Sequence, residues 1–238
     1  MRLFAALLPP ERVRLELAAT VRRLRGLPGA DGLRWVQPAN WHCTLAFFGE
    51  VEEARYEELA RQLGWVSAHS TPQRLRVAAG GRFGDRVLWA GLADAFDHPR
   101  AGTTGQAETE DDRGRSFPPR PEPHGVRRLA EAATAAGGRV GVPVVESRPF
   151  LAHLTLARGR GESALATFAD ALAGTVGSPW TANELVLLRS TLPASGNEEE
   201  QPRYETVEAW PLGRHRRSPV YPSDLGNRRA AATVTVEW

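Results

Sequence analysis

The chain has little of several residue types, and each shortage narrows what the protein can be. Its 238 residues include one cysteine, Cys43, and no lysine. A single thiol cannot form a disulfide within the chain and cannot build a cysteine-rich zinc site. A reducing cytoplasm is therefore the expected location. All 30 side chains counted as lysine or arginine are arginines, which favour planar, bidentate contacts with phosphate over point-charge contacts.

Long apolar runs and a strong net charge are also missing. The apolar start of the chain, residues 3–8, ends at Pro9 and Pro10, so it is too short for a signal peptide or a membrane span. The formal net charge is only +2, which does not by itself indicate nucleic-acid binding. Hydrophobic residues make up 42% and charged residues 24%, as in ordinary soluble proteins. We expect a soluble monomer without membrane contact.

Hydrophobic periodicity predicts alternating helices and strands over residues 1–212. Helices are expected where apolar residues recur at three- and four-residue spacing, at residues 9–25, 51–63, 126–136 and 163–173. Strands are expected where apolar residues cluster or alternate, at residues 3–8, 33–37, 41–49, 74–79, 87–92, 140–146, 150–158, 184–191 and 203–211. Gly80, Gly81, Gly84 and Asp85 predict a turn after the strand at 74–79.

Two segments interrupt or follow this pattern. Residues 94–124 contain five prolines and seven acids but few apolar side chains, so they cannot bury enough apolar surface to offset their ordering entropy. We expect a flexible insertion there, or else a lid that orders over substrate. The arginine-rich residues 213–238 are expected to be a disordered tail, with an RNA-contacting arm or an edge strand as the alternatives.

The two halves of the chain carry the same motif at the same place. His-x-Thr-Leu-Ala occurs at residues 42–46 and again at residues 153–157, each time in a segment with a strand pattern. Side chains alternate along a strand, so each histidine shares a face with the threonine two positions later, while Cys43 faces the core. A pseudo-two-fold relation would turn both pairs toward one cleft. We therefore expect a two-lobed, internally duplicated α+β fold, with antiparallel sheets lining a central cleft and helices outside.

Two imidazoles and two hydroxyls around one tetrahedral group are suited to acid–base chemistry on a phosphate. An imidazole has an unperturbed pKa near 6.5, so one ring can start neutral as the base while the other starts protonated as the acid. Threonine hydroxyls can donate hydrogen bonds to phosphate oxygens without bringing charge. Zinc binding by this pair would need a third ligand, and none has a sensible spacing. We expect no metal and no cofactor.

The sequence around the motifs resembles the two-histidine phosphoesterase superfamily. Within it, residues 41–51 and 148–158 are similar to the RNA 2′,3′-cyclic phosphodiesterases, which are also known as bacterial 2′-5′ RNA ligases. The start, Arg-Leu-Phe-Ala-Ala-Leu, and residues 87–91 are similar to that family too. The resemblance covers residues 1–212 apart from the insertion at 94–124. One departure is Ala152, because the family usually has proline just before the second histidine; we expect only a local backbone effect.

The resemblance implies an activity and roles for the site residues. The protein would open a 2′,3′-cyclic phosphate at an RNA 3′ end to a 2′-phosphomonoester, without a metal. His42 would donate a proton to the departing 3′ oxygen, and His153 would be the base that activates water. Thr44 and Thr155 would hold the phosphate. Some family members also join tRNA halves through a 2′-5′ linkage.

Two further residues are candidates for substrate contact. Arg158 matches an arginine that in the family often follows the second histidine by five residues, where it would neutralise phosphate charge. Simple alternation puts Arg158 on the face opposite His153, so the strand must bulge or end there. Phe48 shares the parity of His42, so it could stack on a base, or else lie in the core.

Two kinds of alternative remain open from the sequence. One keeps the chemistry and changes the substrate to a cyclic phosphate of ADP-ribose, a small cyclic nucleotide or a 2′-5′ oligonucleotide. The other is a non-catalytic protein that binds RNA ends, with the arginine-rich tail supplying affinity. It would show salt-sensitive binding without product, and that binding would weaken when residues 213–238 are deleted.

Overall fold

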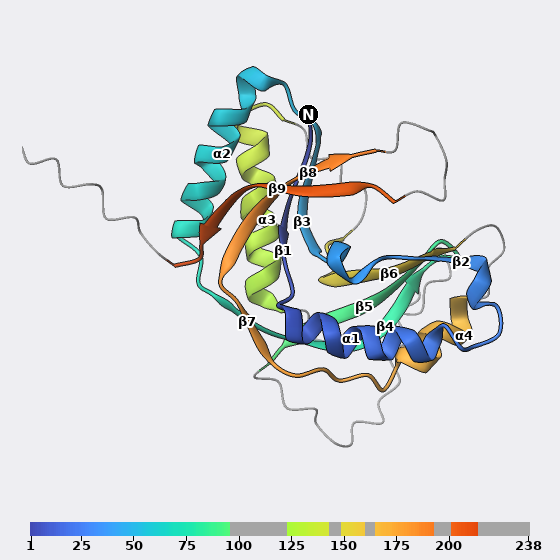
Figure 1. Ribbon diagram of the computed structural model, residues 1–238. Coiled ribbons are helices and arrows are strands. Elements are labelled where there is room, and N and C mark those ends of the chain that lie inside the picture. The colour runs from blue at the N-terminus through green and yellow to red at the C-terminus, as the bar shows by residue number, and fades with distance from the viewer. Residues whose placement is uncertain (96–122, 143–148, 160–164, 193–200, 214–238) are drawn as a thin grey trace, which may run out of the picture.

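The strands of residues 1–212 form two antiparallel sheets (Figure 1). In this computed structural model the residues described are 1–95, 123–142, 149–159, 165–192 and 201–213. The predicted insertion lies outside them except for its two ends, and so does the predicted tail except for Gly213. What was expected of those two segments therefore stays a prediction.

Each sheet contains one of the two motif strands. The four-stranded sheet has the order β3 (Cys43–Glu50), β1 (Arg2–Leu7), β8 (Glu184–Thr191) and β9 (Arg203–Pro211). The five-stranded sheet has the order β2 (Leu33–Trp35), β6 (His153–Gly159), β5 (Val87–Asp94), β4 (Gln73–Phe83) and β7 (Trp180–Ala182). All of these pairings are antiparallel.

The duplication is real, but the two lobes are not the two halves of the chain. In the first repeat, residues 2–83, β1 and β3 belong to the four-stranded sheet, whereas β2 and β4 belong to the five-stranded sheet. In the second repeat, residues 87–211, β5, β6 and β7 belong to the five-stranded sheet, whereas β8 and β9 belong to the four-stranded sheet. Each repeat thus contributes strands to both lobes. This arrangement ties the lobes together around the two motif strands.

Four helices cover the outer faces of the sheets in the part of the chain that the structure describes (Figure 1). They are α1 (Glu11–Leu24), α2 (Glu53–Ala68), α3 (His124–Arg139) and α4 (Leu165–Leu172). Helices α2 and α3 pack together against the four-stranded sheet, whereas α4 packs on β4 and β5 and α1 runs beneath the five-stranded sheet. Small residues on the buried stripe of α3, such as Ala130 and Ala133, allow it to lie close to β3. None of the helices in the described ranges has both the length and the hydropathy of a membrane span.

The motif strands are anchored by alternate side chains that point into the main core. Leu45 on β3 and Leu154 and Leu156 on β6 are fully buried. The other face of the four-stranded sheet carries a small second cluster around Phe4, against which Tyr204 packs. The fold is the two-lobed α+β arrangement that the sequence predicted.

Three local expectations were wrong or incomplete. Gly80 and Gly81 lie within β4 and pair with β5, instead of forming a turn. A Cβ on Gly81 would fall 2.4 Å from the Trp89 ring, so glycine is needed there because an indole fills the space. The strand expected at 140–146 begins as a turn at Val140 and Gly141, and residues 143–146 lie outside the described part. The short strand β7 was missed because three residues carry too little periodicity.

Candidate active site

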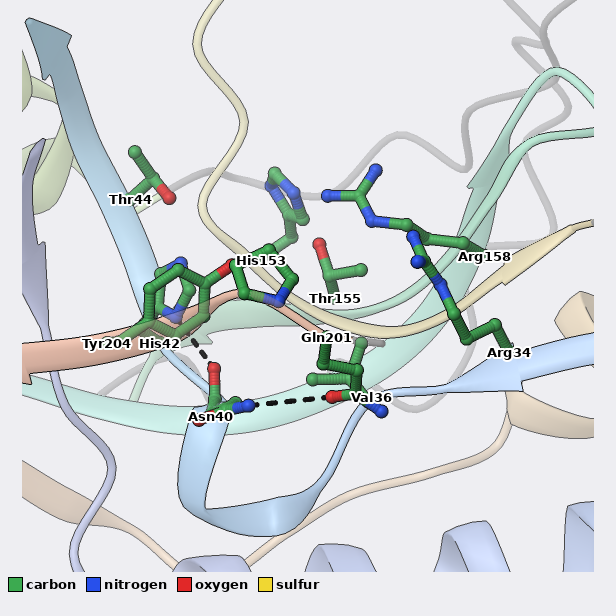
Figure 2. A pocket seen from close by; sticks show the side chains of 11 residues that line it. Arg34, Val36, Asn40, His42, Thr44, His153, Thr155, Arg158, Gln201 and Tyr204 are labelled. Atoms are coloured by element: carbon green, nitrogen blue, oxygen red, sulfur yellow. Dashed lines mark hydrogen bonds between the residues drawn. The ribbon is translucent and has the colours of Figure 1, made fainter. Parts of the chain in front are cut away.

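A cavity of about 190 Å³ opens where the two motif strands approach each other (Figure 2). His42 and Thr44 line it from the start of β3, and His153 and Thr155 line it from β6. Both His/Thr pairs therefore share one pocket, as the duplication predicts. The complete lining is Arg34, Val36, Asn40, His42, Thr44, His153, Thr155, Arg158, Gln201, Pro202 and Tyr204.

The two imidazoles are held by the same local device. His42 Nδ1 lies 2.7 Å from the carbonyl oxygen of Asn40, and His153 Nδ1 lies 2.7 Å from the carbonyl oxygen of Leu151. A carbonyl can only accept, so each Nδ1 carries the proton and donates it. In the neutral ring, Nε2 is then the nitrogen that can accept a proton. Each ring has a defined orientation and one basic nitrogen available for chemistry.

Both motif strands contain a bulge just after the threonine. Along β3 the partners on β1 shift between Thr44 and Ala46, so Leu45 is the extra residue. Along β6 the partners on β5 shift between Thr155 and Ala157, so Leu156 is the extra residue. A bulge puts two consecutive residues on one face and reverses the alternation beyond it.

This reversal decides where the residues after the motifs point. Arg158 joins His153 on the pocket side, which confirms that the strand must bulge to bring it there. In β3 the equivalent position is Phe47, which is half-buried and packs near Phe4. Phe48 is only 2% exposed and belongs to the main core, so of its two expected places the core is the correct one and the stacking on a base is wrong. Plain alternation along β3 does not allow for the bulge at Leu45.

Aromatic rings surround each histidine, but not the same ones. The Phe4 ring lies 4.8 Å from His42 and the Tyr204 ring 5.0 Å from it, measured between ring centroids. The Phe83 ring lies 5.1 Å from His153, edge to face. These contacts restrict ring rotation and remove water from both imidazoles.

The loss of water lowers the pKa of both histidines. Burial is the main cause for His42, whose pKa falls from 6.5 to about 4, with smaller contributions from the charges of His153 and Arg158. Burial is again the main cause for His153, whose pKa is also lowered, and the guanidinium of Arg158 adds to the effect. At neutral pH both rings are therefore neutral before substrate binds.

Cys43 lies behind the pocket and takes no part in it. The side chain is completely buried on the core side of β3, as alternation predicts. Burial raises the pKa of its thiol to about 12. Because the thiolate is the nucleophilic form, this cysteine is inert at neutral pH.

Several lining residues were not singled out from the sequence. Arg34 on β2 is the direct cross-strand partner of Arg158. Tyr204 comes from β9, and burial raises the pKa of its phenol against the opposing charges of Arg158, Arg2 and Arg34. For Arg34 a signal existed, since it stands alone between buried Leu33 and Trp35 and so must face the other way.

Gln201 connects the β9 side of the pocket to the turn that holds His42. Its side-chain amide donates to the Trp35 carbonyl at 2.6 Å, and its Oε1 accepts from Asn40 Nδ2 at 3.5 Å (Figure 2). Oε1 also accepts from the backbone N–H of Gln37 at 3.2 Å. These bonds hold the turn whose carbonyl orients the first imidazole. No sequence pattern predicts them, because they join residues more than 160 positions apart.

The pocket offers few donors for a metal ion. Its lining contains two imidazoles and no carboxylate or thiolate. Among all residues that the structure describes, no group of three or more histidine, cysteine, aspartate or glutamate side chains is placed to hold a metal.

Comparisons with known proteins find phosphoesterases among the proteins similar to this chain. The family model described as "LigT like Phosphoesterase" matches residues 7–89. The chain is 28% identical over 183 residues to an RNA 2′,3′-cyclic phosphodiesterase of Geobacillus stearothermophilus, and the match covers 75% of this chain but 47% of that protein. It is 24% identical over 186 residues to the protein of the same name from Aquifex aeolicus, covering 76% of this chain and 82% of that one. The chain thus spans about half the length of the first relative.

Solved structures show the same fold. The protein TT0787 of Thermus thermophilus superposes with a TM-score of 0.63 at 25% identity, covering 90% of this chain and 98% of that one. LigT of E. coli in its apo form gives a TM-score of 0.60 at 22% identity with the same coverage. These matches confirm the resemblance that the paired motifs indicated and the α+β fold expected from them.

Proposed function

We propose, on the premise that this chain is a relative of the LigT-like phosphoesterases, that it hydrolyses 2′,3′-cyclic phosphates at RNA 3′ ends to 2′-phosphomonoesters. The observation that carries the proposal is the convergence of two His/Thr pairs, one from each sheet, on a single pocket. The names of the curated relatives supply the substrate class. A formally reversed use of the same site would join RNA ends through a 2′-5′ linkage.

The hydrolytic step needs one group to remove a proton and one to supply it. The oxygen of a water molecule forms a bond to phosphorus while His153 Nε2 takes the proton of that water. The bond from phosphorus to the 3′ oxygen breaks, and His42 gives that oxygen its proton. The product carries a 2′-phosphate and a 3′-hydroxyl, and the next cycle needs the proton to pass from His153 back to His42 through solvent.

The roles of the two histidines are taken from the family resemblance. Both rings present Nε2 in the same way, because both are anchored through Nδ1, so the geometry permits either ring to be the acid. The negative charge of a bound phosphodiester raises the pKa of a nearby imidazole. Substrate binding would therefore restore the protonated acid that burial disfavours.

The remaining polar groups would stabilise the charge that develops on phosphorus. Thr44 and Thr155 can each donate a hydroxyl hydrogen bond to a non-bridging oxygen, and Arg158 can neutralise the anion. Donors that are already oriented lose little freedom when the transition state forms. The proposal includes no metal, because the lining supplies only two of the three or more protein ligands that a catalytic zinc site uses.

Product analysis tests this proposal. The full chain is incubated with an RNA oligonucleotide that ends in a 2′,3′-cyclic phosphate, with and without EDTA. The expected product is the 2′-phosphate in equal yield under both conditions. A 3′-phosphate, no reaction, or a reaction abolished by EDTA would contradict the proposal. The His153→Ala variant serves as the matched control, and it should give little product.

A further inference from the structure

One end of the pocket carries two arginines side by side. Arg34 and Arg158 face each other across the β2–β6 pair, and both line the cavity (Figure 2). None of the residues that line the cavity is acidic. The lining at this end therefore supplies two guanidinium groups, whereas the reacting cyclic phosphodiester brings only one negative charge.

The two arginines are not equivalent with respect to the histidines. Figure 2 shows the Arg158 side chain extending toward His153, with Arg34 beside the Arg158 stem. The charge of Arg158 lowers the pKa of both His42 and His153, so it acts on the reacting centre. Arg34 stands on the neighbouring strand and acts with Arg158 on the pKa of the Tyr204 phenol. Arg34 is thus the outer member of the pair.

We propose that Arg34, beside Arg158, forms a second phosphate subsite, which binds the internucleotide phosphate one ribose upstream of the terminal cyclic phosphate. This inference rests on the proposed function. Guanidinium groups suit phosphate because their planar donors can form two parallel hydrogen bonds to it. Arg158 follows His153 by five positions on β6, and the bulge reduces this to four ladder steps, from Gly91 to Val87 on β5. Four ladder steps correspond to about 13 Å along the strand. The Arg158 side chain extends back toward His153, so its guanidinium group lies closer to the imidazole than that (Figure 2).

The subsite makes the pocket selective for a substrate with two phosphates. A nucleoside 2′,3′-cyclic monophosphate would occupy only the histidine end. An RNA 3′ end would occupy both ends, because each nucleotide of the chain contributes a phosphate. Arg34 would then select for a polynucleotide end without touching the atoms that react.

Ligand binding separates the two subsites. The probes are adenosine 2′-monophosphate and adenosine 2′,5′-bisphosphate, whose 5′-phosphate stands where the upstream phosphate would be. Titration calorimetry compares the wild-type chain with Arg34→Gln and Arg34→Lys. The wild type should bind the bisphosphate more tightly than the monophosphate, and Arg34→Gln should reduce that ratio by roughly tenfold or more, the usual value for a hydrogen bond to a charged group. Arg34→Lys should keep part of this affinity ratio, because lysine keeps the positive charge but lacks the paired donors of a guanidinium group.

The control removes the same charge elsewhere. Arg22 is exposed on α1, and Arg22→Gln should leave the affinity ratio unchanged. If Arg34→Gln weakens both ligands by the same factor, or if the wild type does not distinguish them, the second subsite is refuted. A lower ratio in Arg22→Gln as well would refute it too, because the effect would then come from net charge alone.

Turnover shows which kind of second phosphate is preferred. The substrates are adenosine 2′,3′-cyclic monophosphate, the dinucleotide ApA with a terminal 2′,3′-cyclic phosphate, and the cyclic phosphate of ADP-ribose. The proposal expects Arg34→Gln to lower kcat/KM most for the dinucleotide. A largest loss for the ADP-ribose compound would overturn the assignment to an RNA chain. If the wild type converts none of these substrates, the proposed function itself fails. If the wild type converts them normally but Arg34→Gln leaves the affinity ratio unchanged, only the second subsite fails.

Discussion

The two motif strands can be compared almost position by position. Each has a histidine at its first residue or just before it, whose Nδ1 lies 2.7 Å from a carbonyl two residues earlier, and each bulges one residue after its threonine. Five positions after the histidine the strands differ, because β3 has Phe47 where β6 has Arg158. The Phe47 ring lies under the Arg2 guanidinium at 4.9 Å, whereas Arg158 lines the pocket.

This difference indicates a division of labour between the lobes. The groups that the proposal assigns to proton transfer and phosphate binding are duplicated, since each lobe gives one histidine and one threonine to the pocket. The two arginines of the proposed second subsite, Arg34 and Arg158, are neighbours in the five-stranded sheet. The four-stranded sheet instead places the Phe4 and Tyr204 rings beside its histidine. A symmetric scaffold thus holds an asymmetric substrate.

The largest expected effect tests the shared part of the comparison. Replacing His42 or His153 by alanine should each lower turnover of the cyclic phosphate by roughly 10²–10⁴-fold, the usual contribution of one general acid or base. The turnover of the double variant should be only slightly lower than that of the less active single variant, because both histidines act in the same step. Steady-state kinetics measures this, with the exposed His69→Ala as control. A single variant that keeps more than a tenth of wild-type activity would contradict the proposal that both histidines are needed for turnover.

The threonines should matter less and about equally. Thr44→Val and Thr155→Val should each reduce kcat by roughly 10²-fold, because each removes one oriented donor to a phosphate oxygen. Thr181 lies exposed on β7 of the five-stranded sheet, so Thr181→Val is the matched control and should keep full activity. A large loss for one threonine with none for the other would show that only one lobe binds the phosphate.

Arg158 and Phe47 should behave differently, although they occupy equivalent positions. Arg158→Gln should lower kcat/KM by roughly tenfold or more, because a charged hydrogen bond to phosphate is lost. It should also raise the pKa of both histidines, since the guanidinium lowers them, and so move the optimum of kcat/KM to higher pH. Phe47→Leu removes no charge and should leave the optimum in place. Equal shifts of the pH profile in both variants would contradict this assignment.

The smallest expected effect concerns stability. Between pH 6.5 and about 4 the unfolded chain protonates His42 while the folded chain does not, because folding lowers that pKa to about 4. The free energy of unfolding should therefore fall as the pH falls through this range. The free energy of unfolding, measured by urea denaturation, should decrease between pH 7 and pH 5 by up to about 2 kcal/mol less in His42→Gln than in the wild type. Two results would contradict the burial of this imidazole. One is a decrease in the free energy of unfolding that is as large in His42→Gln as in the wild type. The other is a decrease that His69→Gln reduces by as much as His42→Gln does.

The sequence predicted most of the elements and the two His/Thr pairs that share the pocket because both rest on local signals. Strand β8 and strand β9 have the bounds that alternation indicated, and the His-x-Thr repeat located both halves of the site. Errors arose where a single residue changes the geometry. The bulge at Leu45 turned Phe48 into the core, whereas the irregularity needed to bring Arg158 into the pocket was expected and is the bulge at Leu156.

Other features could not be predicted because they depend on pairing between distant segments. Arg34 meets Arg158 only because β2 pairs with β6, and Gln201 meets Asn40 only because β9 lies at the edge of the four-stranded sheet. The contribution of strands to both lobes by each repeat leaves no trace in periodicity. A duplicated motif shows that two halves exist, but it does not show which sheet each of their strands joins.

His42 and His153 are proposed to have opposite roles at one phosphorus atom, one as the acid and one as the base. A nucleoside 2′-O,3′-S-cyclic phosphorothiolate tests this directly, because a departing sulfur needs far less protonation than a departing oxygen. Turnover of this compound and of the all-oxygen substrate is compared in the wild type, His42→Ala and His153→Ala. The loss caused by His42→Ala should shrink by at least about tenfold on the sulfur substrate, since the lost acid is no longer needed, while the loss caused by His153→Ala should persist. Equal rescue of both variants, or rescue of neither, would contradict the paired acid and base.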